Sequence, residues 1–367
     1  MIIHKQGIVK YQEQDFIVSE KIIVKSLKGK NYSVFLLKKN NCSLFNVIMR
    51  LSKILKVPIS NFHFFGEKDK YAITKQILYT PKLNFLEEHI NSRDFELIHL
   101  FDVEEIDSSW MIGNKFNITV RKISNIIEVE EKIKKIINRE IKIPNYYDIQ
   151  RFGKRYINHI IGYYLLNSKY YEATYLFLCA HSKNENHKVK KVRKILKDLF
   201  NGQSFNIHKA LEIKMPQYMD IEKIFLKILS KNNNFKKTWK EFPYKWTSLF
   251  KEAFYSYKFN KSLADYIKNS NVNYFIQKYE INVPEEFHNL LSNFENRIEL
   301  VYPLVQLDFQ KLSLKDLKNR NPLLEPLIYK YNFEKDELFE GYYKLNIEFF
   351  LSRGSFATNF LNFILGG

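Results

Sequence analysis

The chain has 367 residues, of which 45% are hydrophobic and 16% aromatic, and it carries a formal net charge of +18. This composition excludes an intrinsically disordered chain, because enough apolar residues are present to build a core. The basic balance favours polyanionic partners such as nucleic acid or an anionic membrane surface, although lysine-rich chains are also typical of AT-rich genomes.

Cysteine, histidine and glycine patterns exclude further classes. Cys42 and Cys179 are the only cysteines, so no disulfide framework is expected. The nine histidines lack the spacing of zinc ligands, and no metal is expected. Neither a GxGxxG nor a GxxxxGK[ST] loop occurs, so no nucleotide cofactor is expected. No apolar run approaches the ~18 residues of a membrane span, and a cytoplasmic protein is expected.

The first 150 residues mix strand and helix patterns. Apolar positions at helical spacing predict a helix over 43–55, with Ser43 as its N-cap. A second, basic helix is predicted over 129–141, ended by Pro144. Short β-branched, aromatic or alternating runs predict strands at 16–18, 32–37, 71–77 and 115–121.

Helical periodicity dominates the middle of the chain, and strand character returns at its end. Helices are predicted at 160–166, 173–180, 189–200, 221–229 and 248–267, and a strand at 342–351. We therefore expect an α+β protein in which a helix-rich domain, 151–338, is inserted into a catalytic domain formed by 1–150 and 339–367.

One carboxylate stands out in FGEKDKYAITKQ, residues 65–76. Asp69 lies between Lys68 and Lys70 in a turn that leads into a strand, and nearby cations favour the charged form that a nucleophile or base requires. Glu67 also allows a glycosidase-like acid/base pair, although side chains two apart on a strand would stand closer than the ~5 Å that this chemistry needs. An ordinary surface loop fits the same residues.

The segment resembles the signature of the TruD family of tRNA pseudouridine synthases, Gly-x-Lys-Asp-x-x-Ala-x-Thr-x-Gln. The matching residues are Gly66, Lys68, Asp69, Ala72, Thr74 and Gln76. Further N-terminal matches are Gly7, Lys10, Asp15, Phe16, Val18, Glu20 and Lys39.

Later segments are similar to family motifs in the same order. They are WMIGNKFNITVRKI at 110–123, IPNYYDIQRFG at 143–153, the pairs Ser256-Tyr257 and Phe259-Asn260, and Gly354-Ser355-Phe356-Ala357-Thr358. The chain departs from the family at Phe64-Phe65, where Ala is usual, at Tyr147-Asp148, where Phe-Gly is typical, and after Thr358, where Arg-Glu is missing.

The resemblance implies a pseudouridine synthase-type catalytic domain, built on a mixed, mainly antiparallel sheet flanked by helices, with an inserted TRUD-type domain. It implies isomerisation of uridine to pseudouridine in tRNA, at position 13, without cofactor or metal and with no obligatory protein partner. Asp69 would either attack C1′ or remove the C2′ proton of an extruded uridine. The alternative is a tRNA-binding or tRNA-folding module on the same fold with secondary catalysis.

The resemblance also implies roles for six substrate-binding residues. Phe116 would stack on the uracil, Phe16 and Phe356 would line the pocket, and Asn114 would hydrogen-bond substrate. Lys10 would pair with Asp69 or a phosphate, and Arg151 would hold backbone or the turn at 145–146.

Each of these residues also has a structural reading. The phenylalanines could be core residues, Asn114 a turn residue, Lys10 a surface lysine and Arg151 part of a structural salt bridge.

The basic run 188–194 lies on one predicted helix. It is either a solvated helix face or a contact for the RNA backbone.

Overall fold

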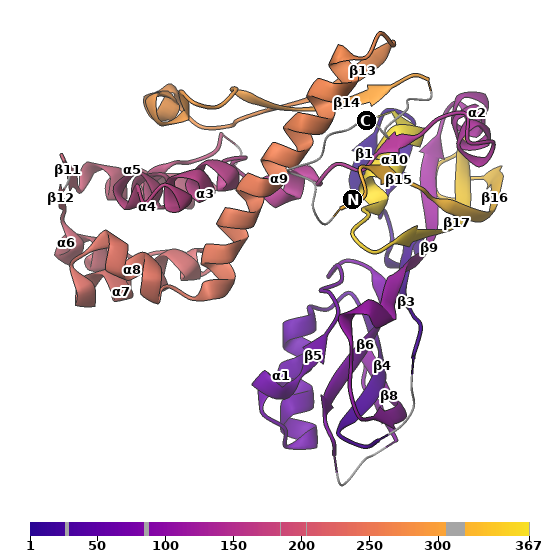
Figure 1. Cartoon of the computed structure of the whole chain (residues 1–367), viewed down its shortest axis with the longest axis horizontal. Coiled ribbons are helices and arrows are strands. Elements are labelled where there is room, and N and C mark those ends of the chain that lie inside the picture. Colours follow the sequence, from indigo (N-terminus) through magenta and orange to yellow (C-terminus); the bar gives the residue numbers. More distant parts are fainter. Residues whose placement is uncertain (26–28, 84–87, 184, 203, 306–319, 367) are drawn as a thin grey trace. The chain divides into compact units, whose positions relative to one another are not determined.

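A computed structural model of the chain describes residues 1–25, 29–83, 88–183, 185–202, 204–305 and 320–366. The chain divides into two compact units (Figure 1). Of the described residues, the first unit contains those of 1–145, Val305 and 323–366, and the second contains those of 146–304 and 320–322.

An 11-stranded sheet forms the first unit. Its main path is β1-β2-β9-β3-β6-β4-β8-β7, while β17 joins β9, β16 joins β17, and β5 joins β6. The strands are β1 Ile2–His4, β2 Gly7–Val9, β3 Phe16–Ile22, β4 Tyr32–Asn40, β5 His63–Phe64, β6 Ile73–Pro81, β7 His89–Asn91, β8 Phe95–Val103, β9 Met111–Ile123, β16 Leu327–Lys335 and β17 Tyr343–Ser352. Among the pairings recorded for the described residues, β3–β6 is parallel and the others are antiparallel. The predicted α+β class with a mixed, mainly antiparallel sheet is confirmed.

Strand β9 is the centre of this sheet, since it pairs with β2, β3 and β17. Its alternation buries Phe116, Ile118 and Val120 on one face. Gly113 is needed where β17 comes close, because a Cβ there would lie 2.1 Å from the Leu351 carbonyl oxygen.

Three helices accompany the sheet: α1 Leu44–Leu55, α2 Ile126–Ile137 and α10 Ala357–Leu365. Helix α1 covers Phe35, Leu37 and Leu78 of β4 and β6, while Phe360 of α10 packs on Phe349 of β17 at 4.6 Å. The Ser43 hydroxyl accepts a hydrogen bond from the Asn46 N–H, as predicted for an N-cap. Helix α2 ends at Ile137, earlier than the predicted 141 and well before Pro144, with its C-cap at Asn138.

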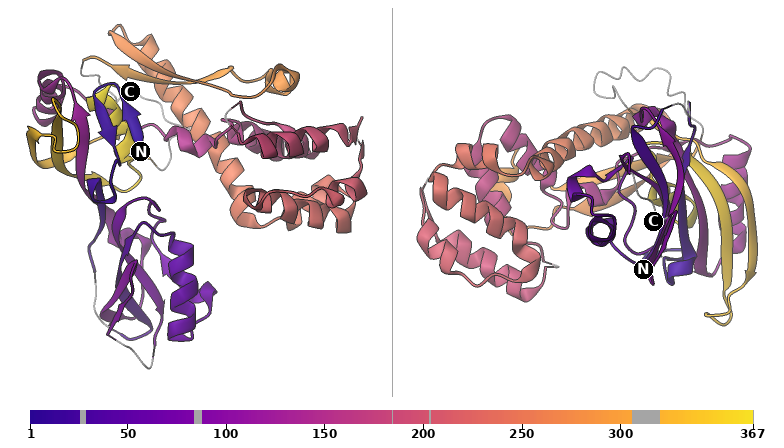
Figure 2. Two further views of the ribbon diagram at one scale, coloured as in Figure 1. Left: turned by 180° about the vertical axis from the view of Figure 1, so that it is seen from behind. Right: turned by 90° about the horizontal axis from the view of Figure 1, so that it is seen from below.

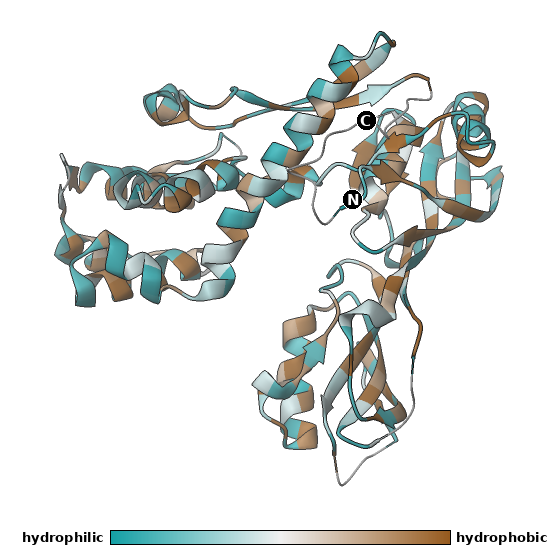
Figure 3. Cartoon of the chain, in the orientation of Figure 1, coloured by the Kyte–Doolittle hydropathy of each residue, from teal (hydrophilic) through white to brown (hydrophobic). Residues whose placement is uncertain are grey.

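The second unit is mainly helical, and every predicted middle helix is present in it. Its helices are α3 Asn158–Leu166, α4 Tyr170–Cys179, α5 His187–Asp198, α6 Ile207–Glu212, α7 Asp220–Asn232, α8 Phe235–Glu241 and α9 Tyr244–Asn269. The views in Figure 2 show α9 as the longest helix of this unit, running beside the hairpin of β13 Tyr274–Glu280 and β14 Arg297–Pro303. Coloured by hydropathy, the helices carry alternating hydrophilic and hydrophobic bands, as amphipathic helices do (Figure 3).

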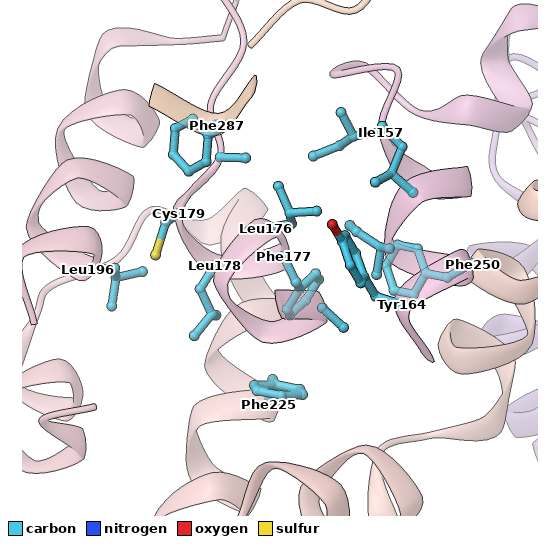
Figure 4. Packing of buried hydrophobic residues seen from close by; sticks show 14 of the residues in the cluster. Ile157, Tyr164, Leu176, Phe177, Leu178, Cys179, Leu196, Phe225, Phe250 and Phe287 are labelled. Atoms are coloured by element: carbon cyan, nitrogen blue, oxygen red, sulfur yellow. The ribbon is translucent and has the colours of Figure 1, made fainter. Parts of the chain in front are cut away.

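The helices of the second unit surround an aromatic core. Phe177 of α4 contacts Phe225 and Phe250 with ring centroids 5.3 and 5.7 Å apart (Figure 4). Gly162 lets α3 approach α9 closely, because a Cβ at this position would lie 2.0 Å from the Phe250 carbonyl oxygen.

Two buried arginines close the C-terminal end of α4. Nη1 of Arg155 donates to the carbonyls of Leu176, Phe177 and Ala180 at 2.7 to 3.1 Å, and burial lowers the pKa of Arg155 to about 9. Arg193 donates to the carbonyl of Phe177 at 3.0 Å and pairs with Glu222 at 2.8 Å. These bonds satisfy carbonyls that the end of a helix leaves without partners.

The structure differs from the expected domain limits at the C-terminal side. The range 151–338 assigns residues 327–335 to the inserted domain, whereas they form β16, which pairs with β17 in the large sheet. Alternating Tyr and Phe on this strand lie among charged residues, so its pattern is weak. The first crossing, between Asn145 and Tyr146, lies close to the expected residue 150.

A buried histidine predicts how the stability of the second unit depends on pH. His159 is fully buried, stacks on Tyr257 at 4.5 Å, and neither ring nitrogen has a hydrogen-bond partner among the described residues. Burial lowers its pKa to about 3, against about 6.5 in an unfolded chain. The neutral ring therefore stabilises the fold above pH 6.5, and this contribution is lost as the pH falls from 6.5 towards 3.

Replacing His159 by Phe should flatten the pH dependence of unfolding between pH 6.5 and 4 by about one proton, or ~1.4 kcal/mol per pH unit. Urea unfolding of both proteins, followed by hydrogen exchange in α3 and α9, measures the two slopes. Equal slopes would show that His159 is not kept neutral in the folded state.

Candidate active site

Asp69 lies in the loop that enters β6, and its side chain is 54% exposed. The Lys10 ammonium, only 14% exposed, lies 2.5 Å from Asp69 Oδ2. Lys10 follows β2 with a left-handed φ of 58°, and its ammonium stands 4.1 Å from the ring centre of Phe16. The structure thus brings together an exposed carboxylate, a largely covered cation and an aromatic ring, although Asp69 is distant in sequence from Lys10 and Phe16.

A second lysine fixes the backbone of the same loop. Lys39 Nζ donates to the Asp69 carbonyl at 2.6 Å and to the Cys42 carbonyl at 3.1 Å. The Lys39 side chain is fully buried on β4, and burial lowers its pKa. Its ammonium therefore acts as a hydrogen-bond donor inside the protein rather than as a surface charge.

A third lysine ties the loop to the sheet through an ion pair. Lys68 Nζ lies 2.5 Å from Glu20 Oε1, and the side chains are 9% and 1% exposed. The other oxygen of Glu20 accepts the Ile77 N–H at 2.7 Å. A buried pair with these additional hydrogen bonds holds the residue before Asp69 in one position.

Strand register explains why the aromatic residues meet near Asp69. Phe116 pairs with Val18 of β3 on one side and Phe349 of β17 on the other, so their side chains share one face. The Phe116 ring stacks on Phe349 at 5.1 Å and meets Phe16 edge-on at 6.2 Å. Phe349 covers one face of the Phe116 ring, and only 6% of Phe116 is exposed in all.

Polar side chains without partners lie on the same face of the sheet. Glu20 pairs with Asn114 across β3 and β9, and Thr74 pairs with both Val18 and Lys39. Three polar side chains of β6 and β9 have buried atoms that lack a hydrogen bond within the part of the chain that the structure describes. The atoms are Thr74 Oγ1, both amide atoms of Gln76, and Asn114 Oδ1. Such atoms are costly to bury unpaired and can accept or donate bonds to a bound molecule.

The other two predicted site residues, Phe356 and Arg151, come from later segments of the sequence. Phe356 is the half-buried N-cap of α10 in the first unit. Arg151 belongs to the second unit, where its guanidinium lies 3.5 Å from Glu252 and over the ring of Tyr147. The neighbouring turn is held by Arg320, which donates to the Tyr146 carbonyl at 2.9 Å.

Sequence reasoning assigned no role to Lys39, Glu20, Thr74 or Gln76, although all four match family positions. A signal was present, because Lys39 shares a strand face with Phe35 and Leu37, and Glu20 shares one with Phe16. A charged residue on an apolar strand face is rarely buried without a partner.

The described residues contain no group of three or more His, Cys, Asp or Glu side chains arranged to hold a metal ion. None of the helices described is both long enough and apolar enough to cross a membrane.

The sequence of the chain is similar to a known protein family. Residues 4–283 match the model of the family described as tRNA pseudouridine synthase D (TruD). A "Probable tRNA pseudouridine synthase D" of Nanoarchaeum equitans is 29% identical over 343 residues, which cover 89% of this chain and 85% of the relative. "Probable tRNA pseudouridine synthase D 1" of Methanococcus maripaludis is 26% identical over 387 residues, covering 95% and 96%.

The fold is shared with a solved structure. The crystal structure of a Methanosarcina mazei protein described as a tRNA pseudouridine synthase D (TruD) superposes with a TM-score of 0.67 at 22% identity, and covers 100% of this chain and 94% of that one. Because the family model spans most of the sequence and includes the loop that carries Asp69, the chain belongs to the TruD family of tRNA pseudouridine synthases.

Proposed function

We propose that this protein isomerises uridine 13 of tRNA to pseudouridine, with Asp69 as its catalytic carboxylate. The observation that carries the proposal is an exposed carboxylate in a loop that three lysines hold. Lys10 contacts the Asp69 side chain, Lys39 donates to the Asp69 backbone carbonyl, and Lys68, the preceding residue, pairs with Glu20. The relatives whose names state an activity are named as tRNA pseudouridine synthases. A cytoplasmic location goes with that substrate.

The proposed reaction needs no redox step and no co-reactant. The C1′–N1 bond of the uridine breaks, the uracil turns, and a C1′–C5 bond forms. The proton on C5 is released while N1 gains one, so substrate and product are isomers. Asp69 either attacks C1′ or removes the proton on C2′, and both routes require the uridine to leave its stack and enter the site.

The sheet face beside Asp69 supports the proposed binding roles. Phe16 and Phe116 provide an aromatic floor. Because Phe116 is only 6% exposed, a uracil that stacks on the face opposite Phe349 would have to displace neighbouring side chains. Asn114, together with Thr74 and Gln76, offers the unpaired polar atoms that could read the edge of a base. We further propose that Lys10 neutralises Asp69 until substrate arrives, and that Phe356 lines the pocket.

Arg151 has an ion pair with Glu252, as its structural reading requires. A contact with RNA backbone remains a proposal for this residue.

The second candidate function is a tRNA-binding or tRNA-folding module, and one experiment separates it from the enzyme. The purified protein is incubated with tRNA that contains 5-tritiated uridine, and release of tritium is measured. Release by the wild type, but not by an Asp69→Asn variant, excludes the pure binding module. Equal release from both proteins would disprove the proposed function of Asp69.

We also propose that the inserted TRUD-type domain holds the body of the tRNA through α5. Lys188, Lys191 and Lys194 are exposed at a spacing of three residues, and none has an ion pair among the described residues. Lys190 instead donates to the Lys183 carbonyl, so its ammonium already has a hydrogen-bond partner within the protein.

Replacing Lys188, Lys191 and Lys194 by Glu should weaken tRNA binding by at least about 10-fold at low salt, because phosphate contacts release counterions. The slope of log Kd against log salt should fall by roughly 2 to 3. Filter binding across a series of salt concentrations measures both quantities.

A charge-matched control replaces Lys236, Lys237 and Lys240 of α8, which are also exposed, by Glu. This variant has the same net charge and should lose clearly less affinity. Equal losses would favour a general charge effect, and unchanged affinity in the α5 variant would favour a solvated helix face.

A further inference from the structure

Three aromatic rings and a lysine form an exposed cluster in the first unit. Tyr11 meets Phe339 edge-on at 5.0 Å, and Lys122 Nζ lies 5.7 Å from the Phe339 ring and 5.3 Å from the Tyr342 ring. Tyr11 is 45% and Tyr342 36% exposed. We call Tyr11, Phe339, Tyr342 and Lys122 the aromatic platform.

The backbone beneath the platform is firmly built. A register shift between β9 and β17 lies at Tyr343/Leu345, and Lys122 has a left-handed φ of 56° there. The Lys122 N–H donates to Asp336 Oδ2 at 2.8 Å, and the Asp336 N–H donates to the Tyr342 carbonyl at 3.0 Å. A bulge of this kind redirects side chains, and here it turns Lys122 towards the rings.

Buried charges reinforce the same turn. Arg121, 7% exposed, lies 2.8 Å from Asp15, 3.3 Å from Asp336 and 2.7 Å from Glu337. Lys344 also pairs with Glu337 at 2.7 Å, so this exposed carboxylate is compensated by two cations. Arg121 and Lys344 thus compensate part of the negative charge of Asp15, Glu334, Asp336 and Glu337, which weakens the repulsion that an approaching polyanion meets there.

The platform is continuous with the site of Asp69 through the chain. Tyr11 directly follows Lys10, whose ammonium contacts Asp69, and Asp15 of the Arg121 network directly precedes Phe16. Consecutive Cα atoms lie ~3.8 Å apart, so Tyr11 starts from backbone next to that of Lys10, and a strand whose uridine reaches Asp69 could bring a neighbouring nucleotide towards Tyr11.

We infer that the aromatic platform stacks an unpaired base adjacent to the target uridine, while Lys122 contacts a backbone phosphate. Exposed rings beside an exposed cation suit single-stranded nucleic acid, because every base offers a flat face and every linkage a charge. Net charge of the chain favours the same partner. The inference rests on the proposed function and adds where the flanking nucleotide is held.

The test uses the Asp69→Asn protein, so that binding is measured without turnover, and a tRNA transcript as the probe. Tyr342→Ala should raise the Kd by about 10-fold, the usual effect of removing one stacking partner. A transcript lacking the base next to the target should bind the parent protein about 10-fold more weakly, yet bind the Tyr342→Ala protein no worse than the intact transcript does. If removing the base and replacing Tyr342 each weaken binding, and the two losses in binding free energy add at every flanking position, the stacking contact would be overturned.

Two further variants keep the inference falsifiable if Tyr342→Ala perturbs folding. Tyr342→Phe keeps the ring and should bind as the parent does, whereas a loss equal to that of the alanine variant would contradict stacking. Lys122→Gln should lower the slope of log Kd against log salt by about 1. An unchanged slope would contradict the phosphate contact.

Tyr329→Ala is the matched control. This tyrosine of β16 is half exposed and lies 5.3 Å from Lys115, which precedes Lys122 by seven residues on β9, roughly 20 Å along a strand. Tyr329→Ala should not change the Kd, and a loss of affinity equal to that of Tyr342→Ala would show that the platform has no special role.

The platform inference and the proposed function can fail separately. If wild-type protein forms pseudouridine but Tyr342→Ala leaves the Kd unchanged, only the platform inference fails. If wild type forms none, the proposed function fails.

Discussion

An Asp69→Asn variant is expected to bind tRNA with nearly unchanged affinity and to form pseudouridine at least ~10⁴-fold more slowly than wild type, as for the loss of an essential catalytic group. The amide has the shape of the carboxylate, but it can neither attack C1′ nor accept the C2′ proton. Single-turnover kinetics with excess enzyme measures the chemical step apart from binding. Because Asp69 is exposed and its backbone is held by Lys39, folding should be unaffected.

Glu67→Gln is the matched control for this variant. Glu67 lies in the same loop, two residues before Asp69, and is also exposed. It should retain activity within a few-fold of wild type. A loss as large as that of Asp69→Asn would instead indicate a pair of carboxylates acting together, as in glycoside hydrolysis.

A Lys39→Met variant is expected to lower kcat about 100-fold while KM for tRNA changes little. Lys39 touches no substrate in this account, but its ammonium holds the Asp69 carbonyl at 2.6 Å. Methionine fills a similar volume without donating a hydrogen bond, so the loop would relax, and a shift of ~1 Å at a catalytic group can cost ~10²-fold in rate. Steady-state kinetics and thermal unfolding should be measured together.

Lys38→Met tests whether the effect is specific to the buried lysine. Lys38 is the next residue along β4, points to the other face and pairs with Glu96 at 2.8 Å. It should leave kcat unchanged. A Lys39→Met protein with a raised KM and an unchanged kcat would contradict the positioning role.

Much of the fold could be predicted from the sequence because the local patterns agree with the packing. The alternation at 115–121 became the centre of β9, and the helical spacing at 43–55 became α1. In both cases one face of the element is buried, so apolar residues recur with the period of that strand or helix.

The hairpin β13–β14 and strand β16 were not predicted, for physical reasons. In β16, Leu327, Tyr329 and Lys330 are all exposed, so its alternation of apolar and polar residues is blurred. The hairpin strands lie 16 residues apart, between Glu280 and Arg297, and no short turn joins them. Such strands form through pairing with distant partners, which a local window does not contain.

The candidate site was predicted in part. Motif order pointed to Asp69. In the structure Lys10 contacts both Asp69 and the Phe16 ring, and Phe16 in turn meets Phe116. Lys39 and Glu20 fix the loop of Asp69. They do so through bonds that join strands β4 and β3 to the loop. No local sequence spacing encodes those bonds, so only the register of the sheet reveals them.

Mapping pseudouridine at nucleotide resolution tests the central proposal most directly. Unmodified tRNA transcripts are incubated with purified wild-type protein or with Asp69→Asn, and each uridine is then examined by carbodiimide-based mapping. A new pseudouridine is expected at position 13 with the wild type, and none with the variant. No pseudouridine with the wild type, or the same pseudouridine with both proteins, would contradict it.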